Sequence, residues 1–162
     1  MGKKGKEIVE AELDIDEVIE DLNTAVANEW TAAYFYWAAA NVIQGIAGEE
    51  VAEYFRKQVQ DELGHAGELA NRIAELGGVP VDMIGKVEGV AKEKLTVPSN
   101  YGDAHGFLRK ALEFEGKVIG YYNNLAKKYF GKDHATYALV SRILASEVRE
   151  EEELETLLGG RR

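Results

Sequence analysis

The positions of the two prolines constrain the fold of this chain more than any other feature of its sequence. Pro80 and Pro98 both lie in one central stretch, 79–102, of the 162 residues. Proline breaks the interior of a helix, so the chain on either side of this stretch can form long helices. Apolar residues there recur at steps of three and four, and no segment alternates with the period of a strand. The sequence therefore predicts an all-α fold, with two long helices before the stretch and two after it.

The ends of these helices are marked by residues that stop or cap a helix. We expect the four helices at about 14–44, 49–76, 103–130 and 134–158. Gly77 and Gly78, followed by Pro80, form a stop signal, and Asp103 is placed to act as an N-cap. The long crossover 79–102 has room for a short helix. It would let the second and third long helices run parallel, as in one class of four-helix bundle.

The predicted bundle is a single domain. We place it at 14–158, between a flexible N-terminal tail (1–13) and a C-terminal tail (159–162). The net charge of −10 favours cations over nucleic acid or an anionic membrane as partners, and we interpret the basic start MGKKGK as a solvated end. No cysteine is present, which excludes disulfides, thiolate zinc sites and a rubredoxin-type iron centre. No apolar run approaches the roughly 20 residues of a membrane span, and no signal-peptide region is visible, so we expect a cytoplasmic protein.

Each predicted helix carries a glutamate within its apolar stripe, near its own middle. The acidic and imidazole side chains on these stripes are Glu29, Glu62, His65, Glu115, Glu147 and Glu150. A buried carboxylate must be neutralised, paired with a base or bound to a metal. The arginines Arg56, Arg72, Arg109 and Arg149 fall off the stripes. Divalent cations are therefore the better explanation, and iron, manganese and zinc all accept glutamate and imidazole ligands.

The spacing of these residues repeats in the two halves of the chain. The recurring pairs are Glu62–His65 and Glu147–Glu150 at three residues, and Glu29–Tyr36 and Glu115–Tyr122 at seven. Side chains three residues apart lie on one side of a helix and can reach one metal ion. Taken singly, such a glutamate is more often a helix-end residue that reaches water, and such a histidine is more often a satisfied core residue. The matched set favours two metal ions related by a pseudo-twofold axis.

Four segments carry a family resemblance. NEWTAAYFYWA (28–38), DELGHA (61–66), ALEFE (111–115) and ILASEVREEEELETLL (143–158) resemble the motif segments of the ferritin-like superfamily, and most closely those of bacterioferritin and archaeal Dps-like ferritins. The resemblance implies a bundle that holds two iron ions per subunit. It makes Glu29 and Glu115 terminal ligands, Glu62 and Glu147 bridging ligands and His65 a further ligand. Tyr36 matches the tyrosine beside the metals, which makes it the candidate catalytic residue.

The sequence also departs from the family pattern. Glu150 stands where the family usually has a second histidine, so one ion would see only oxygen ligands, and Glu151 could substitute for it. Leu63 stands where a haem-binding bacterioferritin has methionine, so no haem is expected. The paired cysteines of many archaeal members are missing. No fifth helix follows the fourth, which favours a homo-oligomer of 12 subunits over a 24-subunit cage or a dimer.

The function implied by the resemblance is that of a ferroxidase. Such a protein oxidises Fe(II) with O₂ or H₂O₂ and stores or detoxifies the iron in an oligomeric shell. Two alternatives stay open. One is a different di-metal carboxylate oxidoreductase, such as a rubrerythrin-like peroxidase or a manganese enzyme, with manganese or zinc in place of iron. The other is a catalytically inactive shell protein, which the glutamate at position 150 would favour.

Overall fold

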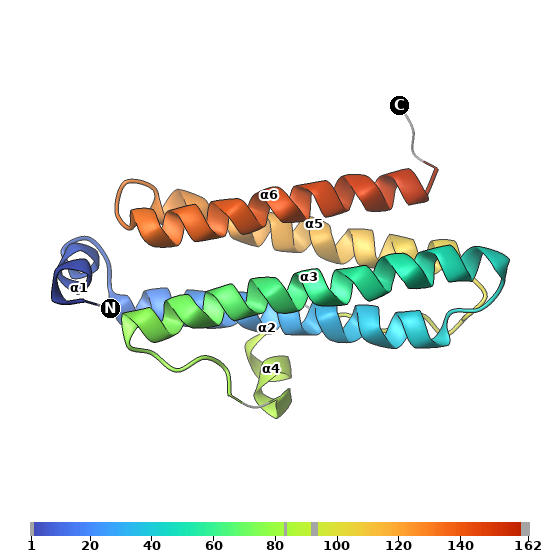
Figure 1. The fold of residues 1–162 in the computed structure, drawn as a ribbon, viewed down its shortest axis with the longest axis horizontal. Coiled ribbons are helices and arrows are strands. Elements are labelled where there is room, and N and C mark those ends of the chain that lie inside the picture. The colour runs from blue at the N-terminus through green and yellow to red at the C-terminus, as the bar shows by residue number, and fades with distance from the viewer. Residues whose placement is uncertain (1, 83, 92–93, 160–162) are drawn as a thin grey trace.

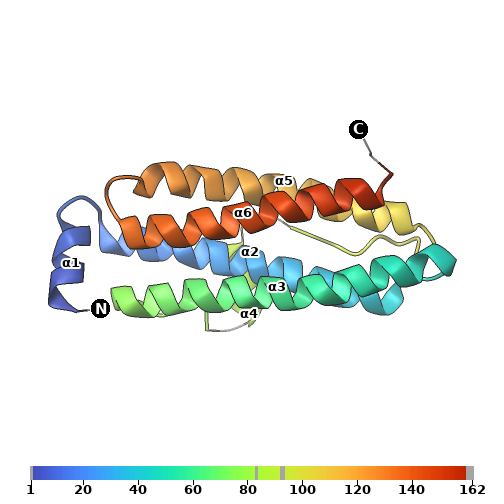
Figure 2. The ribbon, with the colours of Figure 1, turned by 45° about the horizontal axis from the view of Figure 1, so that its top comes forward.

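The computed structural model describes residues 2–82, 84–91 and 94–159, and all the regular structure in these ranges is helical. The helices are α1 (Lys3–Glu10), α2 (Ile15–Val42), α3 (Ile46–Leu76), α4 (Ile84–Val90), α5 (Ala104–Tyr129) and α6 (His134–Leu157). The four long helices form a bundle in which α2 pairs with α3, and α5 pairs with α6 (Figures 1 and 2). The predicted all-α bundle of four long helices is confirmed.

The crossover between α3 and α5 runs the length of the bundle and contains α4. It leaves the end of α3 at one end of the molecule and reaches the start of α5 at the other, so α3 and α5 run parallel (Figure 1). The helix α4 lies against the outer side of α2. The short helix for which the crossover had room is thus present. Among the described residues, no helix combines the length and apolar character that a membrane crossing requires.

Aspartates begin three of the long helices, and a glycine ends one. The side chains of Asp14, Asp103 and Asp133 each accept a backbone N–H from the first turn of α2, α5 and α6 respectively, which satisfies donors that the helix leaves unpaired. Gly77 ends α3 with a φ of 91°, in the left-handed region, and the next residue, Gly78, donates its N–H to the carbonyl of Ile73. Both the N-cap at Asp103 and the stop at Gly77 and Gly78 are as the sequence predicts.

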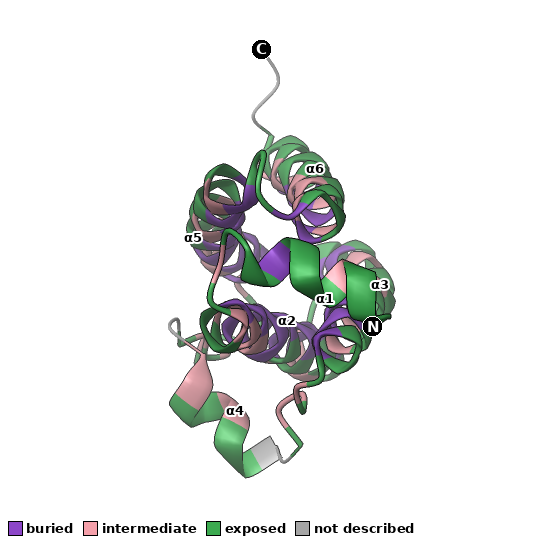
Figure 3. Cartoon of the chain, turned by 90° about the vertical axis from the view of Figure 1, so that its left-hand side faces the viewer, coloured by how far each residue is buried: buried purple, intermediate pink, exposed green. Residues whose placement is uncertain are grey.

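The core lies along the axis between the four long helices, and the exposed residues face outward (Figure 3). Its largest fully buried side chains are aromatic or aliphatic and come from all four helices: Tyr36, Tyr122, Tyr129, Phe35, Phe55, Phe107, Leu22, Leu69, Ile73, Leu108, Ile143 and Leu154. This core holds the four helix backbones in a fixed register, which sets the depth at which the polar residues of each stripe meet.

The N-terminal segment differs from its prediction. Residues 1–13 were expected to form a flexible tail, whereas the structure contains α1 (Lys3–Glu10), which lies across one end of the bundle (Figure 1). Val9 is 2% exposed and packs into the core, and Lys6 forms an ion pair with Glu10 one turn along. Burial of this single apolar residue anchors the helix. Of the predicted C-terminal tail, positions 160–162 lie outside the described residues.

Candidate metal centre

One glutamate from each long helix reaches the middle of the bundle. Glu29 comes from α2, Glu62 from α3, Glu115 from α5 and Glu147 from α6, and each is 1% exposed or less. The apolar stripe of each helix turns its glutamate inward together with its hydrophobic neighbours, because residues three and four apart share one face. The centre of the bundle therefore contains four buried carboxylates.

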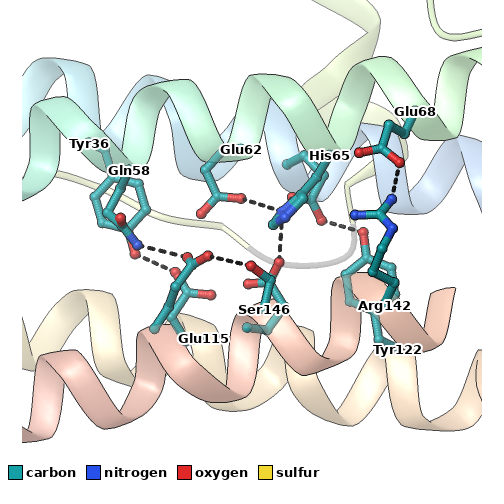
Figure 4. A network of polar contacts seen from close by, with 12 residues as sticks. Tyr36, Gln58, Glu62, His65, Glu68, Glu115, Tyr122, Arg142 and Ser146 are labelled. Carbon is teal, nitrogen blue, oxygen red and sulfur yellow. Dashed lines mark hydrogen bonds and ion pairs between the residues drawn. The ribbon is translucent and has the colours of Figure 1, made fainter. Parts of the chain in front are cut away.

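A first group of possible metal ligands consists of Glu29, Glu62, His65 and Glu147. One ligand atom from each of these residues lies within 4.8 Å of the others. The Nδ1 atom of His65 is 3.0 Å from Oε1 of Glu147, 3.3 Å from Oε2 of Glu29 and 3.7 Å from Oε2 of Glu62 (Figure 4). The group offers one imidazole nitrogen and three carboxylates to a single point, a donor set that suits iron, manganese or zinc.

A second group consists of Glu62, Glu115, Glu147 and Glu150, again with one ligand atom from each within 4.8 Å of the others. Glu150 accepts hydrogen bonds from Nε2 of Gln58 at 2.8 Å and from Oγ of Ser146 at 3.3 Å. Glu62 and Glu147 belong to both groups, so each carboxylate can link two neighbouring ions. The second group contains only oxygen donors.

Two buried tyrosines hold the outer carboxylates of the two groups. The hydroxyl of Tyr36 donates a hydrogen bond to Oε1 of Glu115, and that of Tyr122 donates one to Oε1 of Glu29 (Figure 4). Each tyrosine thus reaches across the bundle to the helix of the other half. Burial, followed by the charge of the glutamate that it contacts, raises the pKa of each tyrosine well above 10. Both hydroxyls therefore remain protonated donors at neutral pH.

The centre leaves much of its hydrogen-bonding capacity unused. Among the described residues, eight buried side-chain atoms have no hydrogen-bond partner. Seven of them belong to the two groups and Gln58: Glu29 Oε2, Gln58 Oε1, Glu62 Oε1, His65 Nδ1, Glu115 Oε2, Glu147 Oε1 and Glu147 Oε2. The eighth is Oδ1 of Asn28, the residue before Glu29. Because buried polar atoms are normally paired, such a concentration of unpaired donor atoms fits cations at this point.

The electrostatics of the cluster also favour binding of a cation. Burial, and then the charge of Glu147, raises the pKa of Glu62 and of Glu115 well above the usual range. The same two causes raise the pKa of Glu150 from 4.5 to about 8. Burial lowers the pKa of His65, but nearby carboxylates, Glu147 first, outweigh it and raise this pKa to about 10. Without a cation the cluster therefore holds extra protons, which a divalent ion would displace.

All six side chains expected to bind metal lie in the two groups, and Tyr36 contacts one of them. Glu150, rather than its neighbour Glu151, supplies the last carboxylate of the second group. Sequence reasoning did not single out Gln58 or Ser146. Gln58 was detectable in principle, because it is a polar residue one turn before Glu62 on an otherwise apolar stripe. The hydrogen bond of Ser146 to Glu150 has no comparable signal in the sequence.

The chain is similar to known proteins over nearly all of its length. The family model for the ferritin-like domain matches residues 19–162. The DNA protection during starvation protein of Pyrococcus furiosus is 31% identical over 150 residues, which cover 92% of this chain and 80% of that protein. The structure superposes with a TM-score of 0.92 on a dodecameric thioferritin, the bacterioferritin-related protein from Bacteroides fragilis. That protein is 32% identical, over 98% of this chain and 94% of the other. A ferritin-like diiron-carboxylate protein from Bacillus anthracis gives a TM-score of 0.76 at 26% identity, over 89% and 96% of the two chains.

Proposed function

This chain belongs to the ferritin family of ferritin-like domains, and from this premise we propose that it is a ferroxidase that oxidises Fe(II) and stores or detoxifies the product. The substrate ions would bind in the two groups at the centre of the bundle. Glu29 and His65 would hold one ion and Glu115 and Glu150 the other. The shared carboxylates would bridge the two ions.

The observation that carries this proposal is the set of six buried ligand atoms of Glu29, Glu62, His65, Glu115 and Glu147 that have no hydrogen-bond partner, although His65 Nδ1 lies within ion-pair distance of Glu147 Oε1 and Glu29 Oε2. A purely structural polar cluster would be expected to satisfy its own atoms, since each buried unpaired group costs about 1–3 kcal/mol. Two divalent ions would satisfy the atoms that belong to the two groups and would also relieve the repulsion between the carboxylates. This supports an ion-binding site rather than a cluster of buried carboxyl groups with a purely structural role.

The donor chemistry supports oxidation of the bound iron. Carboxylate oxygens are hard ligands and stabilise Fe(III) relative to Fe(II). Each Fe(II) ion loses one electron, so a pair of ions reduces O₂ to H₂O₂, or H₂O₂ to water. Tyr36 would act by holding Glu115 in place through its hydroxyl, close to the reacting ions. Reduction of either oxidant consumes two protons, and the protons that the carboxylates give up when iron binds would supply them.

An exposed aromatic face supports assembly into a shell. Trp30, Tyr34 and Trp37 are 39%, 68% and 55% exposed on the outer side of α2. With residues of α3 and of the crossover, they line an apolar cavity of about 510 Å³. Exposed apolar surface of this kind marks an interaction site. We assign it to a second copy of this chain within a shell of 12 subunits, the number that the similar Bacteroides fragilis protein contains.

Anaerobic iron loading tests the proposal. The metal-free protein should bind two Fe(II) ions per chain at the centre. Addition of O₂ or H₂O₂ should then produce ferric absorbance, with more than two irons retained per chain after gel filtration. A single turnover without retained iron would favour a different di-metal oxidoreductase, and no oxidation above the buffer rate would favour an inactive shell. The mass in solution should be near twelve chains of 17.9 kDa.

Replacement of Tyr36 separates the role of this residue from that of the metal ligands. Tyr36→Phe keeps the buried ring but removes the hydrogen bond to Glu115. We expect the rate of iron oxidation to fall about tenfold, as for loss of an outer-shell partner, while two Fe(II) ions still bind. Tyr101→Phe is the matched control, because Tyr101 is exposed and belongs neither to the two groups nor to the aromatic face. An unchanged oxidation rate in Tyr36→Phe would remove Tyr36 from the proposed site.

A further inference from the structure

The four glutamates and the two tyrosines of the centre correspond between its two halves, but two facing positions do not. Glu62 on α3 corresponds to Glu147 on α6, and the two helices face each other across the centre (Figure 4). Three residues after this glutamate, α3 has His65 and α6 has Glu150. Four residues before it, α3 has Gln58 and α6 has Ile143. The symmetry is thus broken at a ligand and also at a residue of the helix opposite.

The two residues that break the symmetry on the side of the second ion, Gln58 and Glu150, contact each other. Nε2 of Gln58 donates a hydrogen bond to Oε2 of Glu150 across 2.8 Å (Figure 4). Gln58 is fully buried, with 0% exposure, and Glu150 is 5% exposed. Ile143, the counterpart of Gln58, is also fully buried but has no group that could hold a ligand. A buried glutamine is uncommon, and this one faces the carboxylate that stands in the place of an imidazole.

The hydrogen bond has a physical consequence for metal binding. A glutamate side chain has more rotatable bonds than a histidine, so it loses more conformational freedom when it becomes a ligand. An amide that already holds one carboxylate oxygen reduces this loss, because it limits the orientations that the Glu150 carboxylate can adopt. The Oγ atom of Ser146, 3.3 Å from Oε1, gives only a longer contact on that side. Partners of this kind typically change metal affinity by about 10–100-fold.

We propose that Gln58 is a positioning residue that fixes Glu150 as a ligand of the second ion and thereby creates an oxygen-only position. This inference rests on the proposed function, because it takes the two groups as ion sites. The two ions are then not equivalent. The position with His65 suits ions that favour nitrogen, whereas the position with Glu150 discriminates less against hard ions such as Mn²⁺ and Fe³⁺ relative to Zn²⁺.

The test is a stepwise anaerobic titration of the metal-free full-length protein with Mn²⁺, in which calorimetry measures the binding of each ion. Gln58→Leu keeps a buried side chain of similar size and removes the amide. We expect Kd for the second ion to rise about tenfold or more, while Kd for the first ion stays within about twofold. The first ion is an internal control for damage to the fold, since both ions share Glu62 and Glu147. The melting temperature of the metal-free variant provides a second control.

Two further variants use the symmetry of the site. Ile143→Val, at the position equivalent to Gln58, should leave both Mn²⁺ affinities unchanged. The double variant Gln58→Ile, Glu150→His copies the first half onto the second, and should raise the preference of the second position for Zn²⁺ over Mn²⁺ by about tenfold or more. Titration with Co²⁺ would show a second nitrogen ligand in its visible spectrum.

The outcomes distinguish this inference from the proposed function. If the wild-type protein binds no divalent ion, the proposed function itself fails. If it binds two ions and Gln58→Leu weakens both equally, or weakens neither, the positioning role of Gln58 fails while the ion sites stand. Weaker binding of the second ion alone, with no change in Ile143→Val, supports the inference.

Discussion

Two buried clusters of charged residues among the described residues differ in how many of their own polar atoms they pair. The end cluster consists of Arg72, Asp133 and Thr136, near the end of α3 and the start of α6. The guanidinium of Arg72 donates to Oγ1 of Thr136 and to Oδ2 of Asp133, each at 2.9 Å, and Asp133 also accepts two backbone N–H groups of α6. No atom of these three residues is among the unpaired buried atoms of the described chain.

The mid-bundle cluster, formed by the two groups of possible ligands, behaves in the opposite way. Its carboxylates outnumber its single histidine, and six of its buried atoms lack a hydrogen-bond partner within the described residues. The pKa shifts also differ between the end cluster and the mid-bundle cluster. Burial works to raise the pKa of Asp133, but Thr136 and Arg72 outweigh it and lower this pKa. For Glu62, burial and like charges together raise the pKa. In a structural cluster the polar atoms pair with one another, whereas the mid-bundle cluster leaves carboxylate and imidazole atoms that could bind a cation.

The largest effect is expected at the end cluster. Arg72→Leu leaves the Asp133 carboxylate buried without its base, which should cost about 3–5 kcal/mol of unfolding free energy. Urea unfolding of the metal-free protein measures this loss. The number of bound Mn²⁺ ions should remain two per chain wherever the variant is folded. If Arg72→Leu were as stable as wild type, the end cluster would not be a structural element.

A substitution in the mid-bundle cluster should separate stability from binding. Glu147→Gln removes a carboxylate shared by both groups, so Mn²⁺ affinity should fall by at least about 100-fold, more than for loss of an outer-shell partner. The metal-free protein should become more stable, because a buried like charge is removed. Calorimetry and urea unfolding check the two effects. A loss of stability without a loss of affinity would show that Glu147 is a structural residue.

A smaller effect is expected from pH, with opposite signs for the two clusters. The pKa of Glu150 is raised from 4.5 to about 8 by burial and Glu147, so its stabilising contribution is complete below pH 4.5 and is lost as the pH rises through 8. The lowered pKa of Asp133 gives stability that is present above its unfolded value of about 3.9 and is lost as the pH falls through its folded value.

Thermal unfolding of the metal-free protein between pH 5 and pH 8 measures the first of these contributions. The melting temperature should fall across this range, and Glu150→Gln should reduce the slope. With Mn²⁺ present the trend should reverse, because the carboxylates must lose protons to bind the ion. A melting temperature that rises with pH in the metal-free wild-type protein would contradict the raised pKa.

The helical periodicity of the sequence is sufficient to predict which residues meet at the centre. A glutamate in an apolar stripe must point the same way as its neighbours, so periodicity alone places Glu29, Glu62, Glu115 and Glu147 inside the bundle. The same reasoning fails for α1, where a single buried residue, Val9, decides the conformation. The eight residues of α1 include three lysines and two glutamates, a composition that suggests a solvated end rather than a helix packed on the bundle.

The sequence by itself determined the four long helices, the crossover and the inward faces that carry the six ligand side chains. These follow from local rules of spacing, capping and chain breaking that act within each helix. Only the tertiary structure decided which side chains touch: Tyr36 with Glu115, Tyr122 with Glu29, and Gln58 with Glu150. These contacts join residues far apart in the chain. They depend on the relative depth and rotation of whole helices, which the packing of the core sets and which no local pattern specifies.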